Sequence, residues 1–449
     1  MKKRHAVAAA LAATALSGTA LGQGQPWLSD RRMGQGAGVR AGDIEIHPGI
    51  AGEVGYDSNY FKRAGTDSEP VYSAARIRVT PHLNLSTLSG PRVEGATPSN
   101  VQFETGVFAV YNEIIPMNSG DFEGKDQRRL DLGANLKLTI APQSKVGGDL
   151  YGDFARVGEP SDTPDPEFAY DRSALRAGAG VTWRPGGGLF EWRLGYEFLY
   201  NFFARENFQD FDNTTHAAKT RGRFRFLPRT AIFYDATFGV LSYRAGSPAN
   251  GGEFVNSRLG LKGLVTNRFA FMVSGGWASS FYEAQVGPIQ DYDSFTAQTE
   301  VRYFLIPQAE LDDGSATVGL SSIAAGYTRS FANGYLGNYF GRDRGYAEFA
   351  YFVGGIFALT LQGGYSNYSY PDSYRGNGAV LQPAFNQGRA DATIFGEYRL
   401  TDGVGIFTTF RYNAVLTKTV ILADPAVPAS ADDLSYSRLE AYLGLRWFL

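Results

Sequence analysis

The sequence predicts an all-β protein, a closed antiparallel β-barrel of about eighteen strands (range 16–20) that crosses a membrane. Three observations support this prediction. Polar and apolar residues alternate over unusually long rows. Short turns and long polar connections follow one another along the chain. The first residues have the composition of an export signal.

The alternating rows are too long for an ordinary soluble sheet. Residues 130–140 place Leu, Ala or Ile at every even position and Asp, Gly, Asn, Lys or Thr at every odd one. Similar rows occur at 190–202, 390–400 and 404–412. Strands of soluble sandwiches usually run about 5 to 6 residues, whereas these rows run about 11 to 17. A long-stranded soluble solenoid is the alternative, but no fixed-period repeat supports it.

Eighteen candidate strands account for most of the chain. They span residues 43–57, 72–89, 100–114, 128–141, 145–157, 171–184, 189–204, 212–226, 229–244, 254–266, 268–284, 291–306, 313–330, 338–352, 355–370, 385–401, 403–417 and 433–449. Short turns, as at 141–144 and 401–403, alternate with long polar connections, as at 58–71 and 418–432. This alternation predicts that both termini lie in the periplasm. The first and last strands must pair, because hydrocarbon offers no hydrogen-bond partner to an open edge.

The N-terminus indicates export. Residues 1–22 carry Lys2, Lys3 and Arg4 before an Ala-rich apolar run, which is the pattern of a signal peptide. An uncleaved anchor is the alternative, and the shortness of the run disfavours it. We expect a periplasmic tail at 23–42 and one barrel at 43–449. The chain has no cysteine, which excludes a disulfide framework, a thiolate metal site and a lipoprotein anchor.

The charge balance excludes a nucleic-acid binder. The formal net charge is −3, and loss of residues 1–22 removes three cations and no acids, which leaves 39 Lys and Arg against 45 Asp and Glu, or −6. Such a chain lacks the basic surface that binding to phosphates requires. We expect no cofactor and no metal site.

Charged residues within the strands predict a polar lumen. A Lys or Arg facing lipid near the membrane midplane costs about 2 to 4 kcal/mol, so charges within strands are expected to point inward. The residues predicted to line the lumen are Glu191, Arg193, Glu197, Lys219, Arg221, Arg223, Arg225, Glu300, Arg302, Asp391, Glu397, Arg399, Arg411, Arg438, Glu440 and Arg446. Because both signs occur, one interpretation is a hydrated pathway for uncharged or weakly charged hydrophilic solutes. The other is a set of paired ladders that keep a wide barrel rigid.

The last strand is typical of a barrel that closes on itself. Leu443, Leu445, Trp447 and Leu449 form its predicted lipid-facing row. This row resembles the C-terminal insertion signal of outer-membrane proteins, from which it departs by ending in Leu rather than Phe or Trp. The resemblance implies the barrel-assembly machinery as a partner. Aromatic residues near predicted strand ends would form the interfacial girdles, and they are Trp183, Phe281, Tyr368, Tyr370 and Trp447.

Catalysis is the competing class, and few residues support it. After residue 22 the only histidines are His47, His82 and His216. His216 has no serine two residues later, as outer-membrane phospholipases have. Asp210 and Asp212 stand near it and would allow an acidic protease-like group, although acids in a turn are the commoner interpretation. We therefore predict no catalytic residues and no enzyme activity.

The first predicted strand carries a resemblance to a known family. Residues 46–61, IHPGIAGEVGYDSNYF, resemble the opening strand and Asp-Ser-Asn loop of a bacterial outer-membrane β-barrel porin family. With the strand pattern, the resemblance covers nearly all of the chain after the signal peptide. It implies a location in the outer membrane of a Gram-negative bacterium. Some barrels of this kind export exopolysaccharide, so a carbohydrate polymer is one cargo that the resemblance implies.

The sequence thus predicts an outer-membrane channel for hydrophilic solutes, with polysaccharide export as its favoured specialised form. A non-conducting structural or adhesion barrel plugged by loops is the main alternative, and an outer-membrane hydrolase is a weaker one. Lipid and lipopolysaccharide are expected partners. The acidic segment 158–167 would suit cations that bridge lipopolysaccharide, but a solvated loop is the commoner interpretation. Cargo, direction of transport and oligomeric state are not determined by the sequence.

Overall fold

The computed structural model describes residues 38–66, 70–87, 99–118, 123–159, 170–247, 249–283, 288, 290–305, 321–334, 338–353, 356–374, 380–418, 420–422 and 431–449. The predicted signal peptide and most of the predicted tail lie outside these residues. So do parts of several predicted connections, including most of the acidic segment 158–167.

Eighteen long strands form one sheet. They are β2 (Ile44–Asp57), β3 (Ala74–Thr87), β4 (Val101–Pro116), β5 (Arg129–Ile140), β6 (Val146–Glu159), β7 (Tyr170–Trp183), β8 (Phe190–Phe203), β9 (Asn213–Leu227), β10 (Thr230–Tyr243), β11 (Gly252–Thr266), β12 (Phe269–Tyr282), β13 (Tyr292–Phe304), β14 (Ser322–Asn333), β15 (Tyr339–Val353), β16 (Phe357–Tyr370), β19 (Phe385–Thr401), β20 (Val404–Val415) and β23 (Tyr436–Phe448). Every predicted strand corresponds to one of them. The largest difference in bounds is at the predicted strand 313–330, where β14 begins at Ser322 and residues 306–320 lie outside the described part.

Short elements lie before the first long strand and between the long strands. They are β1 (Val39–Ala41), β17 (Ser373–Tyr374), β18 (Val380–Gln382), β21 (Val420–Leu422), β22 (Ala431–Asp433) and the 3-10 helices η2 (Gly124–Gln127) and η4 (Glu206–Phe211). β1 pairs with the start of β2, so the segment 23–42, expected to be linker-like, ends in a short hairpin. No helix in the described residues is long and apolar enough to cross a membrane.

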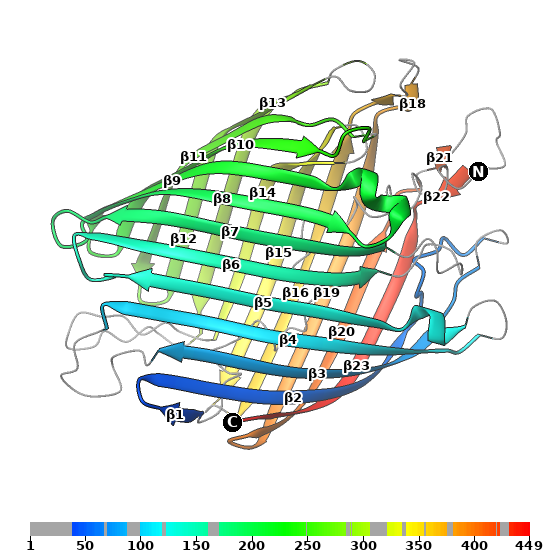
Figure 1. The fold of residues 1–449 in the computed structure, drawn as a ribbon, viewed down its shortest axis with the longest axis horizontal. Coiled ribbons are helices and arrows are strands. Elements are labelled where there is room, and N and C mark those ends of the chain that lie inside the picture. The colour runs from blue at the N-terminus through cyan, green and yellow to red at the C-terminus, as the bar shows by residue number, and fades with distance from the viewer. Residues whose placement is uncertain are drawn as a thin grey trace.

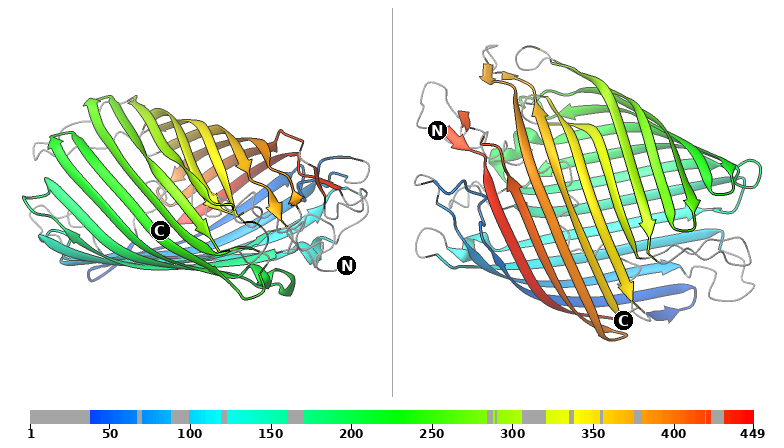
Figure 2. Two further views of the ribbon diagram at one scale, coloured as in Figure 1. Left: turned by 90° about the horizontal axis from the view of Figure 1, so that it is seen from above. Right: turned by 180° about the vertical axis from the view of Figure 1, so that it is seen from behind.

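The sheet closes on itself. Each long strand pairs antiparallel with the next, and β2 pairs with β23 from Gly49 opposite Phe448 to Asp57 opposite Glu440. In Figure 1 the strands from β2 to β10 cross in front of the steeper strands from β14 to β23, and the view from behind shows this second wall directly (Figure 2). Closure confirms the predicted eighteen-strand barrel and leaves no open edge among these strands.

Alternation along β23 separates an outer face from an inner one. The exposed fraction is 58% for Leu443 and 54% for Leu445, but 3% for Arg446. The register places the same kinds of side chain on the same faces of the neighbouring strands, because residues directly opposite one another share a face. The outer face is therefore apolar and exposed, and the charges lie inside.

Three of the five residues predicted to form aromatic girdles lie on the outer face, and the prediction is wrong for the other two. Trp183, Phe281 and Trp447 are exposed on the outer face. Tyr368 and Tyr370 are buried instead, in an inner-face cluster with Phe340. Both tyrosines occupy even positions of β16 that the pairing with β15 turns inward, a register that composition near a strand end does not reveal.

Buried ion pairs join the strands on both sides of the closing contact. The Arg438 guanidinium on β23 donates to Asp57 at the end of β2, with Nε and Oδ1 2.9 Å apart. Arg76 on β3 contacts Glu440 at 2.9 Å. The guanidinium carbon of Arg78 lies 3.6 Å from the centroid of the Tyr442 ring. Charges that leave water must be paired, so these contacts require one register between the first and last strands.

Large inner side chains lie flat over glycines of the neighbouring strand. A Cβ atom at Gly239 would stand 2.3 Å from the ring of Phe254, and one at Gly178 would stand 2.2 Å from Tyr151. Phe407 covers Gly444 in the same way. Aromatic cover of strand glycines restores packing that glycine lacks. The glycines therefore leave room for rings along the wall, and this accounts for part of the high glycine content of the chain.

The described residues at the tip of the β14–β15 hairpin, 331–334 and 338–339, turn into the barrel. Pairing between β13 and β14 stops at Ala297 opposite Arg329. Beyond it, Phe331 stacks on Tyr292 with ring centroids 4.3 Å apart. The Tyr282 hydroxyl on β12 donates to Asn333 Oδ1 at 2.6 Å. Tyr282 and Tyr292 point inward, so the tip lies against the inner faces of β12 and β13 and narrows the lumen.

The closing ion pairs predict a stability difference. We expect Arg438→Met to lower the free energy of unfolding by about 3 to 5 kcal/mol, because it removes the closer of the two cations that contact the buried Asp57 and leaves only Arg76, at 3.4 Å. Arg128→Met is the matched control: Arg128 pairs with Glu113 but its side chain is 52% exposed, so a loss of at most about 1 kcal/mol is expected. Urea titration in detergent, followed by heat-modifiable gel mobility, measures both. Equal losses would show that the closing pairs do not hold the seam.

Candidate functional site

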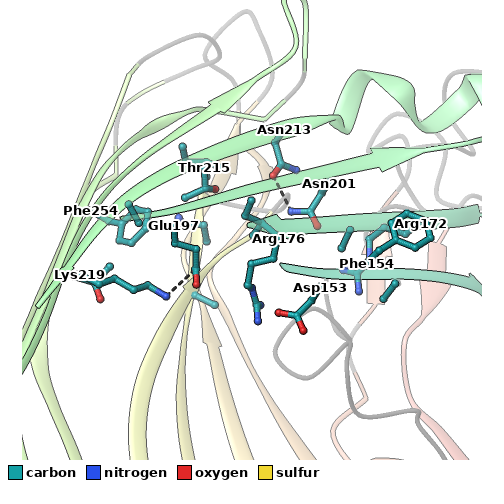
Figure 3. A pocket seen from close by; sticks show the side chains of 18 of the residues that line it. Asp153, Phe154, Arg172, Arg176, Glu197, Asn201, Asn213, Thr215, Lys219 and Phe254 are labelled. Carbon is teal, nitrogen blue, oxygen red and sulfur yellow. Dashed lines mark hydrogen bonds and ion pairs between the residues drawn. The ribbon is translucent and has the colours of Figure 1, made fainter. Parts of the chain in front are cut away.

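A cavity of about 660 Å³ lies inside the barrel, between the wall formed by β4–β11 and the β14–β15 tip. Phe331, Ala332 and Asn333 border it on the tip side. The wall contributes charges, amides and a hydroxyl, and Figure 3 shows Asp153, Arg172, Arg176, Glu197, Asn201, Asn213, Thr215, Lys219 and Phe254 around it. This mixture of polar groups and rings is typical of a site that binds hydrophilic molecules.

Hydrogen bonds hold the polar groups of the cavity in place. Glu197 on β8 accepts a hydrogen bond from the Tyr151 hydroxyl at 2.7 Å and contacts the Lys219 ammonium at 2.7 Å. Asn201 donates to Asn213 at 3.0 Å (Figure 3). Each partner belongs to a different strand, so the groups are fixed by the sheet register rather than by a flexible loop.

The register places the sixteen predicted lumen residues on the inner face, where most of them form ion pairs. Arg193 contacts Asp149 at 2.6 Å, Arg223 contacts Glu191 at 3.1 Å, and Arg446 contacts Glu397 at 2.5 Å. The other contacts are Glu300 with Arg302, Arg302 with Glu348, Asp391 with Arg344, Arg399 with Glu397 at 3.8 Å, and Glu440 with Arg76 and Arg438. Arg411 stands directly opposite Glu440. Arg221 and Arg225 are exposed.

Several residues of the inner wall were missing from the sequence prediction. They include Asp149, Tyr151, Asp153, Arg176, Arg344 and Glu348, which occupy the same alternate positions as the predicted ones. Alternation along each strand is enough to predict that these residues face the lumen. The inward turn of the β14–β15 tip has no comparable signal, because it depends on where pairing with β13 ends.

The geometry gives no support to the hydrolase alternative. His216 lies on the outer face of β9, and its Nδ1 is 2.6 Å from the Tyr196 hydroxyl rather than beside Asp210 or Asp212. Asp212, which precedes β9, accepts a hydrogen bond from the Phe203 amide at 2.8 Å, and burial raises its pKa. Within the described ranges no group of three His, Asp or Glu is arranged to hold a metal ion.

Closure and the two faces define the class of protein. In hydrocarbon every backbone polar group needs an internal partner, and a closed sheet with an apolar outer face and a charged interior meets that condition. This is the architecture of Gram-negative outer-membrane proteins. The chain is therefore an outer-membrane β-barrel protein.

The chain is similar to several solved structures whose sequences are very different from its own. OccAB4 of Acinetobacter baumannii is 12% identical, with a TM-score of 0.43 over 90% of this chain and 98% of that one. The outer membrane protein opdK of Pseudomonas aeruginosa is 13% identical, with a TM-score of 0.43 over 90% and 99%. The siderophore receptor PiuA of A. baumannii is 10% identical, with a TM-score of 0.47 over 92% and 82%. No protein-family model and no curated protein matches the sequence.

Proposed function

We propose that the protein is a channel that passes small hydrophilic solutes across the outer membrane. The observation that carries this proposal is the cavity of about 660 Å³ inside a closed barrel, lined by paired charges and side-chain amides. Eighteen strands enclose more space than inward side chains alone would fill. The flat packing of rings over glycines keeps further space open along the wall.

Carbohydrate is the cargo that we propose for a specialised form of this channel, with polysaccharide export as its role. The Phe254 ring lines the same cavity as the side-chain amides of Asn201, Asn213 and Asn256. Side-chain amides donate to and accept from sugar hydroxyl groups, and an aromatic ring covers the apolar face of a pyranose. This combination supports a sugar more than it supports a metal complex or a purely apolar ligand.

Three further assignments belong to the same proposal. Both termini face the periplasm, because the short connections, such as Asp402–Gly403, lie at the end of the barrel where the chain ends at Leu449. The barrel-assembly machinery recognises the outer row at the C-terminus, which consists of Leu443, Leu445, Trp447 and Leu449. Trp447→Asp is therefore expected to lower the yield of folded barrel in cells. Normal yield would remove that role. Lipopolysaccharide covers the exposed outer face.

Single-channel recording tests the channel and its cargo together. The purified barrel in a planar bilayer is expected to give stable conductance, interrupted by maltodextrins of increasing length. Phe254→Ala should weaken the maltodextrin block about three- to tenfold, since an aromatic contact contributes about 0.5 to 1.5 kcal/mol. Unchanged block would remove Phe254 from the sugar site. Conductance without any block would leave a channel but reject the carbohydrate cargo.

The inward β14–β15 tip favours one other function, a structural or adhesion barrel whose lumen is closed. Its contacts with Tyr282 and Tyr292 hold it inside the wall. A silent bilayer, with heat-modifiable mobility showing that the barrel is folded, would establish this alternative and reject the channel.

The glycine positions give a second test of the open lumen. Gly239→Ala places a methyl group where the Phe254 ring lies, so we expect the ring to move off the wall and the conductance to fall. Gly239→Ala combined with Phe254→Ala should restore it, because no ring remains to be displaced. Equal conductance in the single variant and the parent would show that this part of the lumen does not limit ion flow.

A further inference from the structure

The inner face of β6–β11 carries more cations than anions. Among the side chains that the structure describes, its acids are Asp149, Asp153, Glu191, Glu197 and Asp235. β7, β8 and β11 contribute Arg172, Arg176, Arg193, Arg258 and Lys262. β9 adds Lys219, Arg221, Arg223 and Arg225. Nine cations against five acids leave a surplus of four, although the whole chain has a net charge of −3.

Ion pairing accounts for the five acids and leaves this surplus in place. Asp149, Glu191 and Glu197 each pair with one cation of the wall, as described above, and Asp235 pairs with Arg258 at 3.1 Å. Asp153 stands directly opposite Arg176 (Figure 3). No acid of this wall with a described side chain is then left for Arg172, Arg221, Arg225 and Lys262.

Arg221 and Arg225 are the two members of the surplus that lie on β9. Both are exposed, and neither forms an ion pair with any residue in the part of the chain that the structure describes. Asp235 stands directly opposite Arg221, but its carboxylate contacts Arg258 instead. The guanidinium groups are therefore free to contact what enters the lumen.

The four β9 residues form a cation column from Arg225 to Lys219. Alternate residues of a strand are about 7 Å apart, so the column is about 20 Å long. It begins near the turn after Leu227 and ends at the cavity, where Lys219 lies beside Glu197 (Figure 3). A solute that moves along β9 therefore passes a cation about every 7 Å.

We propose that the cation column on β9 makes the channel selective for anionic solutes bearing carboxylate or phosphate groups. Guanidinium groups bind both anions through paired N–H donors, and a narrowed lumen strengthens the field of fixed charges. This inference rests on the proposed channel function and refines its cargo from neutral to acidic molecules. The acidic cargo is either a small organic acid or an acidic polysaccharide.

The reversal potential in a KCl gradient tests the selectivity. The parent barrel is expected to pass chloride in preference to potassium, more strongly at low salt because screening is weaker. Arg221→Gln with Arg225→Gln should lower the chloride-to-potassium permeability ratio roughly twofold for each charge at about 0.15 M salt. A unit charge about 8 Å away in water attracts chloride and repels potassium equally, and screening at this salt reduces each effect to a little over a third. Arg221→Lys with Arg225→Lys should keep the parent ratio.

Lys125→Gln with Arg128→Gln is the matched control. It removes the same charge from two side chains that are 63% and 52% exposed outside the wall of β6–β11, so the ratio should stay at the parent value. A control that lowers the ratio as much as the β9 variant would overturn the proposal, because total charge and not the column would then set selectivity.

Acidic sugars distinguish the two cargo sources. Galacturonate and oligogalacturonates are compared with maltodextrins of the same length as blockers. Block by the monomer supports a small organic acid, and block by the oligomers alone supports an acidic polysaccharide. A folded, conducting barrel that prefers potassium, or that maltodextrins and oligogalacturonates block equally, overturns the anion proposal and leaves the channel. A silent folded barrel overturns both.

Discussion

The pairing of β2 with β23 is the contact on which the rest of the structure depends. Hydrocarbon provides no partner for a free N–H or C=O group, so a sheet in a membrane is stable only if its edges meet. The hydrogen bonds of this contact are the same as those elsewhere in the sheet and do not by themselves select one register. The charged side chains around it do, because a shift by one residue would turn Arg438, Glu440 and Arg446 towards lipid.

The inner charges therefore differ between two sides of the barrel: on one side they are buried and paired, and on the other they are accessible to solvent. Near the closing strands the side chains of Asp57, Arg76 and Glu440 are buried and satisfy one another. On β9 the cations outnumber their partners and remain accessible to solvent. The two interpretations of the sequence, paired ladders and a hydrated pathway, both describe this lumen, but each applies to a different part of the circumference.

Alternation and turn spacing were sufficient to predict the barrel, its strand number and the outer row of β23. Both signals are local, because residues two apart share a face whatever the rest of the fold does. The same rule turns Arg221 and Arg223 inward. Tyr368 and Tyr370 were assigned to the wrong face from their place near a strand end, although they share the parity of Thr360 and Gln362. The inward tip at Phe331 and Asn333 was not predictable, because it follows from where pairing between β13 and β14 stops.

Because aromatic rings lie over glycines, the open width of the lumen can change while the diameter of the backbone barrel stays the same. Strand number and stagger fix the diameter of the backbone cylinder, and changing them requires the gain or loss of a whole hairpin. The clear width inside depends on whether rings such as Phe254 and Tyr151 lie along the wall or stand away from it, and each depends on one glycine opposite. Point mutations can therefore adjust the bore in small steps during evolution, while the lipid-facing surface and the closing strands stay unchanged.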